Sequence, residues 1–589
     1  MRVLPFGFSI LILLTSVLPA QGRPSSTDSS FILLVVPESD TTITPTSVYR
    51  LSASTNPGHR VTVNDKPFKV YPSGAFVGLL DLQVGENPFT IVSTNDSGKS
   101  ISKSFLIIRS KPLATTSRDT LAIEDTMMEP ASDCWLDEGD VFEVQMKGTP
   151  GCVATFLDGR VMHEVSPSEA NGLEGVYRGT YKVTKDDTLN DRRIPFRLER
   201  IDGRIVTKES QARVSFKQRN FPLVGVTKGD RVALDFGLGD DRLGGAKLSF
   251  IEEGIRLAIT GRMNGRYRVK LTESQEAWIP ADQVTLQPSG THLPYSLTGN
   301  WSVSGDTRFD YVSIGLSEKL PYSSFQESDP ARINVDVYGA VANSNWISQQ
   351  LNTKEIKNAY YTQVAKQQFR ITIELNHPQI WGYHIGYKGN LLTIRIKRQP
   401  EKLKVKALTF VLDAGHGGDN KGAIGATGVK EKDVTLSIVN HLRDVLERRG
   451  ARVILTRSSD SSLTMLDRLK TVWASDADIL VSIHANSVGL ATNPDDIMGV
   501  STFYKHICYR PLSVFILKQV LKTGLVSFGN IGSFNFALNS PTELPNVLVE
   551  AGFISNPGDE MKLLDDDFRT DLAKRIVDGI DDFLDSCDD

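Results

Sequence analysis

The C-terminal part of the chain contains the stretch Leu408-Thr-Phe-Val-Leu-Asp-Ala-Gly-His416, in which a mostly apolar run ends abruptly in polar residues. Two later runs do the same, Ile479-Leu-Val-Ser-Ile-His484 and Asn546-Val-Leu-Val-Glu550. Such runs are typical of buried strands, and helical patterns separate them, so we expect neighbouring parallel strands. Residues 404–587 are therefore predicted to form an α/β domain with a mostly parallel sheet.

Functional groups gather at the carboxyl ends of the strands in such sheets, which would bring His416, His484 and Glu550 together. A fourth residue, Glu431, opens a helical pattern that Gly450 ends. The glycine-rich residues 417–428 before it can fold this carboxylate back towards the first histidine. A buried imidazole or carboxylate is costly without a partner, and a shared cation would remove much of that cost.

Two imidazoles and one carboxylate suit zinc, with a fourth position left to water in a catalytic site. Zinc would acidify that water and polarise a carbonyl, and Glu550 would take and return the proton. Each residue alone has a simpler explanation. A histidine at a strand end is often a satisfied core residue, and Glu431 alone would be a helix-start charge stabilised by the dipole.

Four motifs in order resemble one family: Asp-Ala-Gly-His416-Gly-Gly, Glu431-Lys, Ser-Ile-His484-Ala-Asn and Val-Glu550-Ala-Gly-Phe-Ile-Ser-Asn-Pro. They resemble the zinc-dependent N-acetylmuramoyl-L-alanine amidases of type 3, over residues 409–584. The resemblance implies zinc held by His416, Glu431 and His484, with Glu550 as the catalytic acid/base. It also implies cleavage of the amide between N-acetylmuramic acid and the L-alanine of the stem peptide in peptidoglycan.

Residues around this core have secondary expectations. Asp413 and Asn486 are candidates to accept the second N–H of the metal-bound histidines. Thr456, Arg457 and Arg468 are interpreted as supporting the fold. His506 and Cys508 fall where the chain departs from the family pattern, and they are poor evidence of a second metal site. Residues 487–498 are short and lack a helical period, so we expect a site that no helix of its own blocks.

The region before residue 404 is rich in short strand patterns and turn residues, which predicts several all-β modules. The expected parts are an immunoglobulin-like (Ig-like) sandwich at 31–110, a linker at 111–132, a β-rich module at 133–217, an SH3-like module at 221–288 and a β-sandwich accessory domain at 293–400. Cys134 and Cys152 could pair in an exported protein, but their spacing does not decide it.

Residues 1–20 are typical of a secretory signal peptide, because one arginine precedes a short apolar run and a small-residue cleavage site. We therefore expect export to the periplasm or cell envelope, or release from the cell. A net charge of −4 argues against nucleic acid as a partner. The expected partner is peptidoglycan, and the need for a protein activator and the oligomeric state stay open.

Two alternatives remain beside the amidase. One is another zinc amidohydrolase or peptidase that acts on wall peptides, since the same ligands serve many amides. The other is a catalytically inactive or regulatory wall-binding protein, against which the intact set of candidate residues counts.

Overall fold

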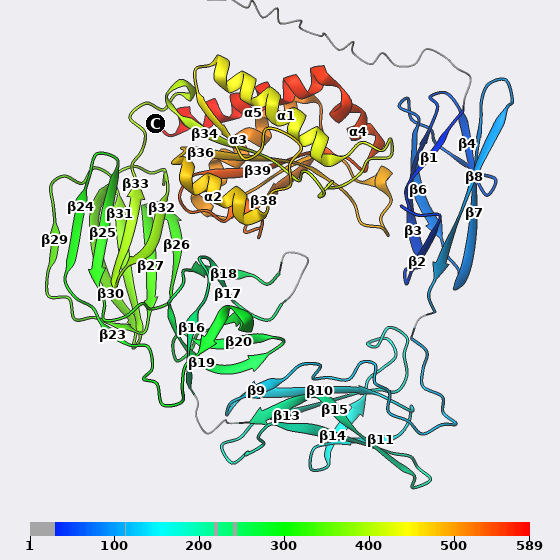
Figure 1. The fold of residues 1–589 in the computed structure, drawn as a ribbon, viewed down its shortest axis with the longest axis horizontal. Helices are drawn as coiled ribbons and strands as arrows, with labels where there is room; N and C mark the ends of the chain where they lie inside the picture. The colour runs from blue at the N-terminus through cyan, green and yellow to red at the C-terminus, as the bar shows by residue number, and fades with distance from the viewer. Residues whose placement is uncertain (1–29, 112, 217–221, 240–243, 589) are drawn as a thin grey trace, which may run out of the picture.

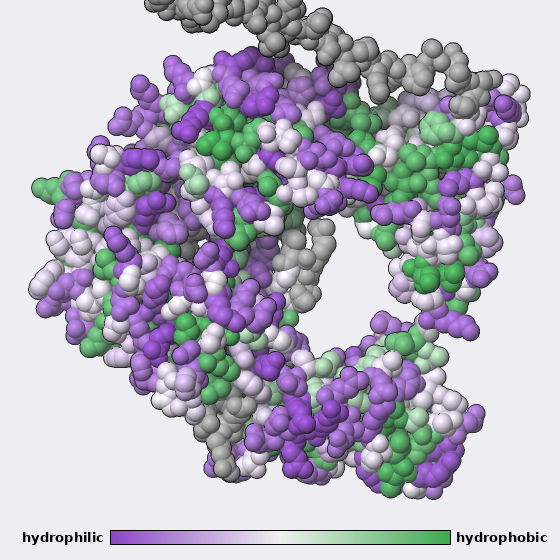
Figure 2. Space-filling view, viewed as in Figure 1, coloured by the Kyte–Doolittle hydropathy of each residue, from purple (hydrophilic) through white to green (hydrophobic). Residues whose placement is uncertain are grey.

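The computed structural model describes residues 30–111, 113–216, 222–239 and 244–588, and the expected signal peptide at residues 1–20 lies outside them. Most of the described chain is β-structure in several sheets, followed by a C-terminal α/β domain (Figure 1). Within these ranges no helix is long and apolar enough to cross a membrane. The space-filling view in Figure 2 has an opening in the middle of the molecule, bordered by the β modules and the C-terminal domain.

The C-terminal domain is built on one six-stranded sheet in the order β35-β34-β36-β39-β37-β38. All neighbours in it are parallel except β37 and β39, so the expected mostly parallel sheet is present. Its strands are β34 (Thr409–Ala414), β35 (Arg452–Leu455), β36 (Ile479–Asn486), β37 (Val500–Phe503), β38 (Ser527–Ile531) and β39 (Asn546–Phe553). Its helices are α1 (Glu431–Arg448), α2 (Met465–Ser475), α3 (Arg510–Val520), α4 (Pro557–Leu564) and α5 (Asp566–Ser586).

Alternation along the strands explains the layers of this domain. Phe410 and Leu412 of β34 face the core that α1, α3 and α5 share, whereas Val411 faces a second core with Leu469 and Val472 of α2. Both faces of the sheet are therefore covered, which is why its central strands are apolar on both sides.

The first module consists of two facing sheets, β1-β3-β6 and β2-β8-β7-β4-β5. Leu51, Phe76, Ile91 and Ile107 fill the space between them. The strands are β1 (Ile32–Val36), β2 (Thr41–Thr44), β3 (Val48–Thr55), β4 (Arg60–Val63), β5 (Lys66–Phe68), β6 (Ala75–Asp81), β7 (Gly85–Thr94) and β8 (Ser100–Arg109).

The second module contains β9 (Cys134–Leu136), β10 (Val141–Lys147), β11 (Val153–Phe156), β12 (Arg160–Glu164), β13 (Val176–Lys182), β14 (Arg192–Glu199) and β15 (Ile205–Phe216). Part of the segment expected as a linker belongs to it, because Ile123 and Met128 are buried in its core. Isolated β-bridges also join Ile123 to Gly148 and Glu129 to Gln145. The thiols of Cys134 and Cys152 are free, so the pairing that the sequence left open is not formed.

The third module pairs with the second through Arg262 of β19 and Trp135 of β9. Its strands are β16 (Leu223–Thr227), β17 (Val232–Asp235), β18 (Lys247–Ile251), β19 (Arg256–Met263), β20 (Arg266–Lys270), β21 (Glu276–Pro280) and β22 (Val284–Leu286). Because Arg268 of the third module also forms an ion pair with Asp140 of the second, at 2.5 Å, the two modules are in direct contact.

The fourth module has two main sheets, β29-β24-β25-β33-β32 and β26-β27-β31-β30, and a small pair, β23 and β28. Its strands are β23 (Ser296–Leu297), β24 (Trp301–Gly305), β25 (Phe309–Gly315), β26 (Tyr322–Ser328), β27 (Ala331–Tyr338), β28 (Ala340–Val341), β29 (Ile347–Gln349), β30 (Ile356–Ala365), β31 (Gln368–Leu375), β32 (Tyr383–Lys388) and β33 (Leu391–Lys397). It contacts the C-terminal domain, since Gln379 donates to the carbonyl of Cys508 at 2.9 Å and Trp381 packs on Phe583.

Candidate metal and catalytic site

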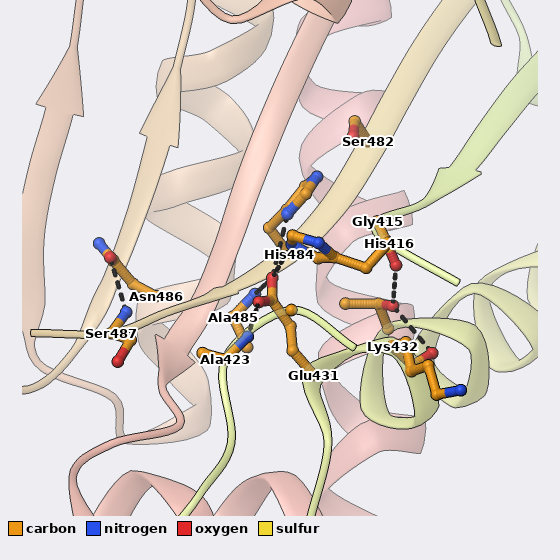
Figure 3. Close-up of polar contacts among 12 residues, drawn as sticks. Gly415, His416, Ala423, Glu431, Lys432, Ser482, His484, Ala485, Asn486 and Ser487 are labelled. Carbon is orange, nitrogen blue, oxygen red and sulfur yellow. Dashed lines mark hydrogen bonds and ion pairs between the residues drawn. The ribbon is translucent and has the colours of Figure 1, made fainter. Parts of the chain in front are cut away.

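The four candidate residues converge at the carboxyl edge of the C-terminal sheet. His416 follows β34, His484 lies near the end of β36, and Glu550 lies on β39 as the direct register partner of His484. Glu431 is the first residue of α1, and Figure 3 shows its carboxylate pointing towards the two imidazole rings. The sheet topology therefore brings together residues that lie up to 134 positions apart in the chain.

The Glu431 carboxylate is the centre of this cluster. Its Oε1 lies 3.1 Å from Nε2 of His416 and 3.0 Å from Nδ1 of His484. Side-chain exposure is 23% and 22% for the two histidines but 6% for Glu431. The candidate ligand atoms of the three residues all lie within 4.8 Å of one another, so the group could hold a metal ion that solvent can still reach.

Burial and hydrogen bonding act in opposite directions on the pKa values of this cluster. Burial favours the neutral acid, but hydrogen bonds from His416 and His484 outweigh it and hold the pKa of Glu431 well below its usual range. Burial also lowers the pKa of His484, yet the hydrogen bond to Glu431 and the charges of Glu550 and Glu431 raise that pKa to about 8. The carboxylate is therefore ionised and shared by two nitrogen donors.

Glycines allow the close approach of these side chains. A Cβ on Gly415 would lie 2.4 Å from Cε1 of His484, and one on Gly422 would lie 2.5 Å from Oε2 of Glu431. Such contacts are too short for any larger residue, so both positions require glycine. The backbone also holds the carboxylate, because Ala423 and Ala485 donate to it at 2.8 and 3.1 Å.

The hydrogen-bond partner of His416 differs from the expectation. Its Nδ1 lies 2.9 Å from Oδ1 of Asn420, in the glycine-rich loop. Among the described residues, neither histidine hydrogen-bonds to Asp413 or Asn486, and the Asn486 side-chain oxygen accepts from the Ser487 amide instead. Asn420 lies four residues after His416. A loop that folds back on itself brings residues at this spacing together, and that was the signal in the sequence for this contact.

Asp413 lies three residues before His416 but has a different environment. It accepts from Arg468 at 2.5 Å, from Thr456 at 2.6 Å and from Ser482 at 2.8 Å. Burial would raise its pKa, but the Arg468 guanidinium and these hydroxyls hold the pKa of Asp413 below its usual value. Arg457 donates to the carbonyls of Ala414 and Gly415, so this network fixes the backbone that leads to His416.

The segment after His484 has little regular structure. Residues 487–498 contain no α-helix, and their one regular element is the short 3-10 helix η3 (Pro494–Asp496). His506 lies elsewhere, with its Nε2 donating to the carbonyl of Ser540 at 3.0 Å. Among the residues that the structure describes, one group of three or more His, Cys, Asp or Glu side chains is close enough to share a metal ion. This group is His416, Glu431 and His484.

Comparison with known proteins identifies the domain. Residues 410–582 match the N-acetylmuramoyl-L-alanine amidase family. The "Probable cell wall amidase LytH" of Staphylococcus aureus is 32% identical over 227 residues, which are 38% of this chain and 74% of that protein. The chain belongs to this family. The present chain is also 34% identical to the uncharacterized protein YqiI of Bacillus subtilis over 181 residues, which are 31% of this chain and 87% of YqiI.

Solved amidase structures are also similar to part of this chain. The catalytic domain of the amidase CwlV from Bacillus (Paenibacillus) polymyxa is 34% identical, and the match covers 30% of this chain and 98% of that one, with a TM-score of 0.29. The CwlD amidase from Clostridioides difficile, solved in complex with the GerS lipoprotein, is 30% identical over 30% of this chain and 99% of that one, with a TM-score of 0.29. Family membership makes the chain a peptidoglycan hydrolase for the amide between N-acetylmuramic acid and L-alanine.

Proposed function

We propose that this amidase holds zinc with His416, Glu431 and His484 and uses Glu550 as its catalytic acid/base. The observation that carries the proposal is the ionised Glu431 carboxylate, which lies within 3.1 Å of both imidazoles in a half-open site. Two nitrogen donors and one oxygen donor on three different elements fit zinc, and they leave one side for water and substrate.

Zinc held by these residues would act as a Lewis acid towards the amide carbonyl and would lower the pKa of a water molecule. The chain's own residues do the rest. Asn420 fixes the ring orientation and tautomer of His416, which keeps its other nitrogen available as a ligand. Glu550 lies beside His484 in the β36–β39 ladder, and its charge helps to raise the pKa of His484. It takes the proton of the attacking water and delivers it to the leaving nitrogen of L-alanine.

The β modules have a supporting role in this proposal. Residues 31–110 form an immunoglobulin-like sandwich, residues 221–288 an SH3-like module and residues 293–400 an accessory sandwich, and together they place the enzyme on the wall. The protein is exported to the periplasm or cell envelope, where peptidoglycan is its partner. The absence of an α-helix in residues 487–498 supports activity without a protein activator.

The test is digestion of purified peptidoglycan by the zinc-loaded protein, with product masses read by mass spectrometry. Glu550→Gln and a chelated sample are the controls, and Glu355→Gln in the fourth module is a matched buried glutamate outside the cluster. We expect free stem peptides that begin with L-alanine, lost by about 10³-fold or more in Glu550→Gln. Intact peptidoglycan with zinc bound would contradict activator-free activity, and Glu550→Gln at the wild-type rate would contradict the role of Glu550.

A further inference from the structure

The first module contacts the C-terminal domain at a segment that comes directly after the candidate site. Arg50 of β3 donates through Nη1 to the carbonyl of Val488 at 2.6 Å and to Oγ of Ser487 at 3.3 Å. Its backbone amide donates to the carbonyl of Leu490 at 2.7 Å. Tyr71 donates to a carboxylate oxygen of Asp495 at 2.8 Å, so residues 487–495 are held at both ends.

The same segment is tied to the strand that carries Glu550. The amide of Val488 donates to Oγ of Ser555 at 3.1 Å, and Nδ2 of Asn556 donates to the carbonyl of Pro494 at 2.9 Å. Ser555 lies five residues after Glu550, and Ser487 lies three residues after His484. Residues 487–495 therefore bridge the first module and the two strand ends of the site.

The first module also contacts the other loop of the site. Ala75 and Val77 of β6 form a small apolar cluster with Ala426, and Ile424 packs against the core of the module. On its opposite side this loop is held by Glu560 of α4, which accepts from the amide and hydroxyl of Thr427 at 2.9 and 2.6 Å. Figure 1 shows the module beside α4, at the end of the domain where these loops lie.

Arg50 is an unusual residue for a mere surface contact. It is buried, and burial lowers its pKa, although only neutral oxygens of residues 487 and 488 accept from its guanidinium among the contacts described. Hydrogen bonds from a charged donor to neutral acceptors are stronger than neutral ones and depend on geometry. The arrangement therefore fixes the position of the segment more than a flat apolar contact would.

We propose that Arg50 and Tyr71 are positioning residues for amide hydrolysis: the docked first module holds residues 487–495 in the shape that admits the peptidoglycan strand to the site. This inference rests on the amidase function. Both residues lie outside residues 410–582, the part that matches the family, so the proposed positioning contact comes from outside the matched domain.

The experiment compares the full chain with Arg50→Ala, Arg50→Lys and Tyr71→Phe, using soluble peptidoglycan fragments as substrate. The matched control is Arg60→Ala, which removes an exposed arginine from the same module. We expect Arg50→Ala to raise KM about 10-fold and Tyr71→Phe to raise it about 3-fold, with kcat and zinc content unchanged. Arg50→Lys retains a donor for Val488 and should fall between Arg50→Ala and the wild type, whereas Arg60→Ala should match the wild type.

Tyr71→Phe removes only a hydroxyl, so it decides the question if Arg50→Ala fails to fold. Asp495→Ala should then add little to Tyr71→Phe, because the two changes break the same contact. An unchanged KM in both Tyr71→Phe and Asp495→Ala would overturn the proposal, as would a loss of kcat alone. A higher activity would also overturn it, because the module would then cover the site. An inactive wild type would instead contradict the amidase function.

Discussion

Two buried carboxylates, Glu431 and Asp413, lie at the same edge of one sheet but have opposite surroundings. Asp413 has its own cation, Arg468, and the side chains of the pair are 1% and 4% exposed. Among the described residues, Glu431 contacts two imidazoles and two backbone amides but forms no ion pair with an arginine or lysine. Burial alone does not distinguish a structural carboxylate from a metal ligand, whereas the charge of its neighbours does.

The largest effect should come from Glu431→Ala. Removing the shared carboxylate leaves two imidazoles as the only protein ligands, so we expect loss of bound zinc and a fall in amidase activity of about 10³-fold or more. Metal analysis and peptidoglycan digestion measure both. The control is Asp433→Ala, two residues further along α1, which should keep both. Stoichiometric zinc in Glu431→Ala would remove this residue from the ligand set.

Asp413→Ala should act on stability instead. It leaves Arg468 buried without its carboxylate, so we expect a loss of about 3–5 kcal/mol in the free energy of unfolding of the C-terminal domain. Urea unfolding measures it. The double variant Asp413→Leu with Arg468→Met should lose less than Asp413→Ala, because no charge then stays unpaired. A loss below about 1 kcal/mol in Asp413→Ala would show that the pair is replaceable.

A smaller effect is expected for Asn420→Ala, which removes the oxygen that holds Nδ1 of His416. Loss of such a partner typically weakens metal binding by about 10–100-fold, so zinc affinity should fall within that range while the fold is kept. Competition with a chelator measures the affinity. Asn440→Ala, on α1, is the control and should leave it unchanged. Equal affinities in the two variants would mean that His416 needs no orienting oxygen.

The smallest effect is expected for His441→Gln. This histidine also lies on α1 and also contacts a carboxylate, Asp566, at 3.1 Å, but that carboxylate is 71% exposed. Exposed pairs contribute little, so we expect stability to change by less than about 1 kcal/mol and zinc content to stay the same. Thermal unfolding and metal analysis check both quantities, and a loss of zinc would show that an exposed pair can affect the site.

The sequence predicted the sheet and the convergence of His416, Glu431 and His484, because the carboxyl ends of parallel strands lie at the same edge of a sheet. It did not predict Asn420, since glycine-rich loops have no fixed periodicity from which a side-chain direction could be inferred. Ile123 was missed because a single apolar residue in a polar stretch does not reveal a packed segment. The Arg50–Val488 contact joins residues 438 positions apart, and no local pattern encodes such a distance.

Docking of the first module also has a topological consequence. The second module contacts the third, the third contacts the fourth through Glu252 and Lys319, and the fourth contacts the C-terminal domain. The contact between residues 30–110 and the C-terminal domain therefore closes the chain into a ring around the opening in Figure 2. A contact closed in this way works at the high effective concentration of a tethered pair. Even a weak interface can therefore remain formed most of the time, and its opening would convert a compact ring into an extended string of modules.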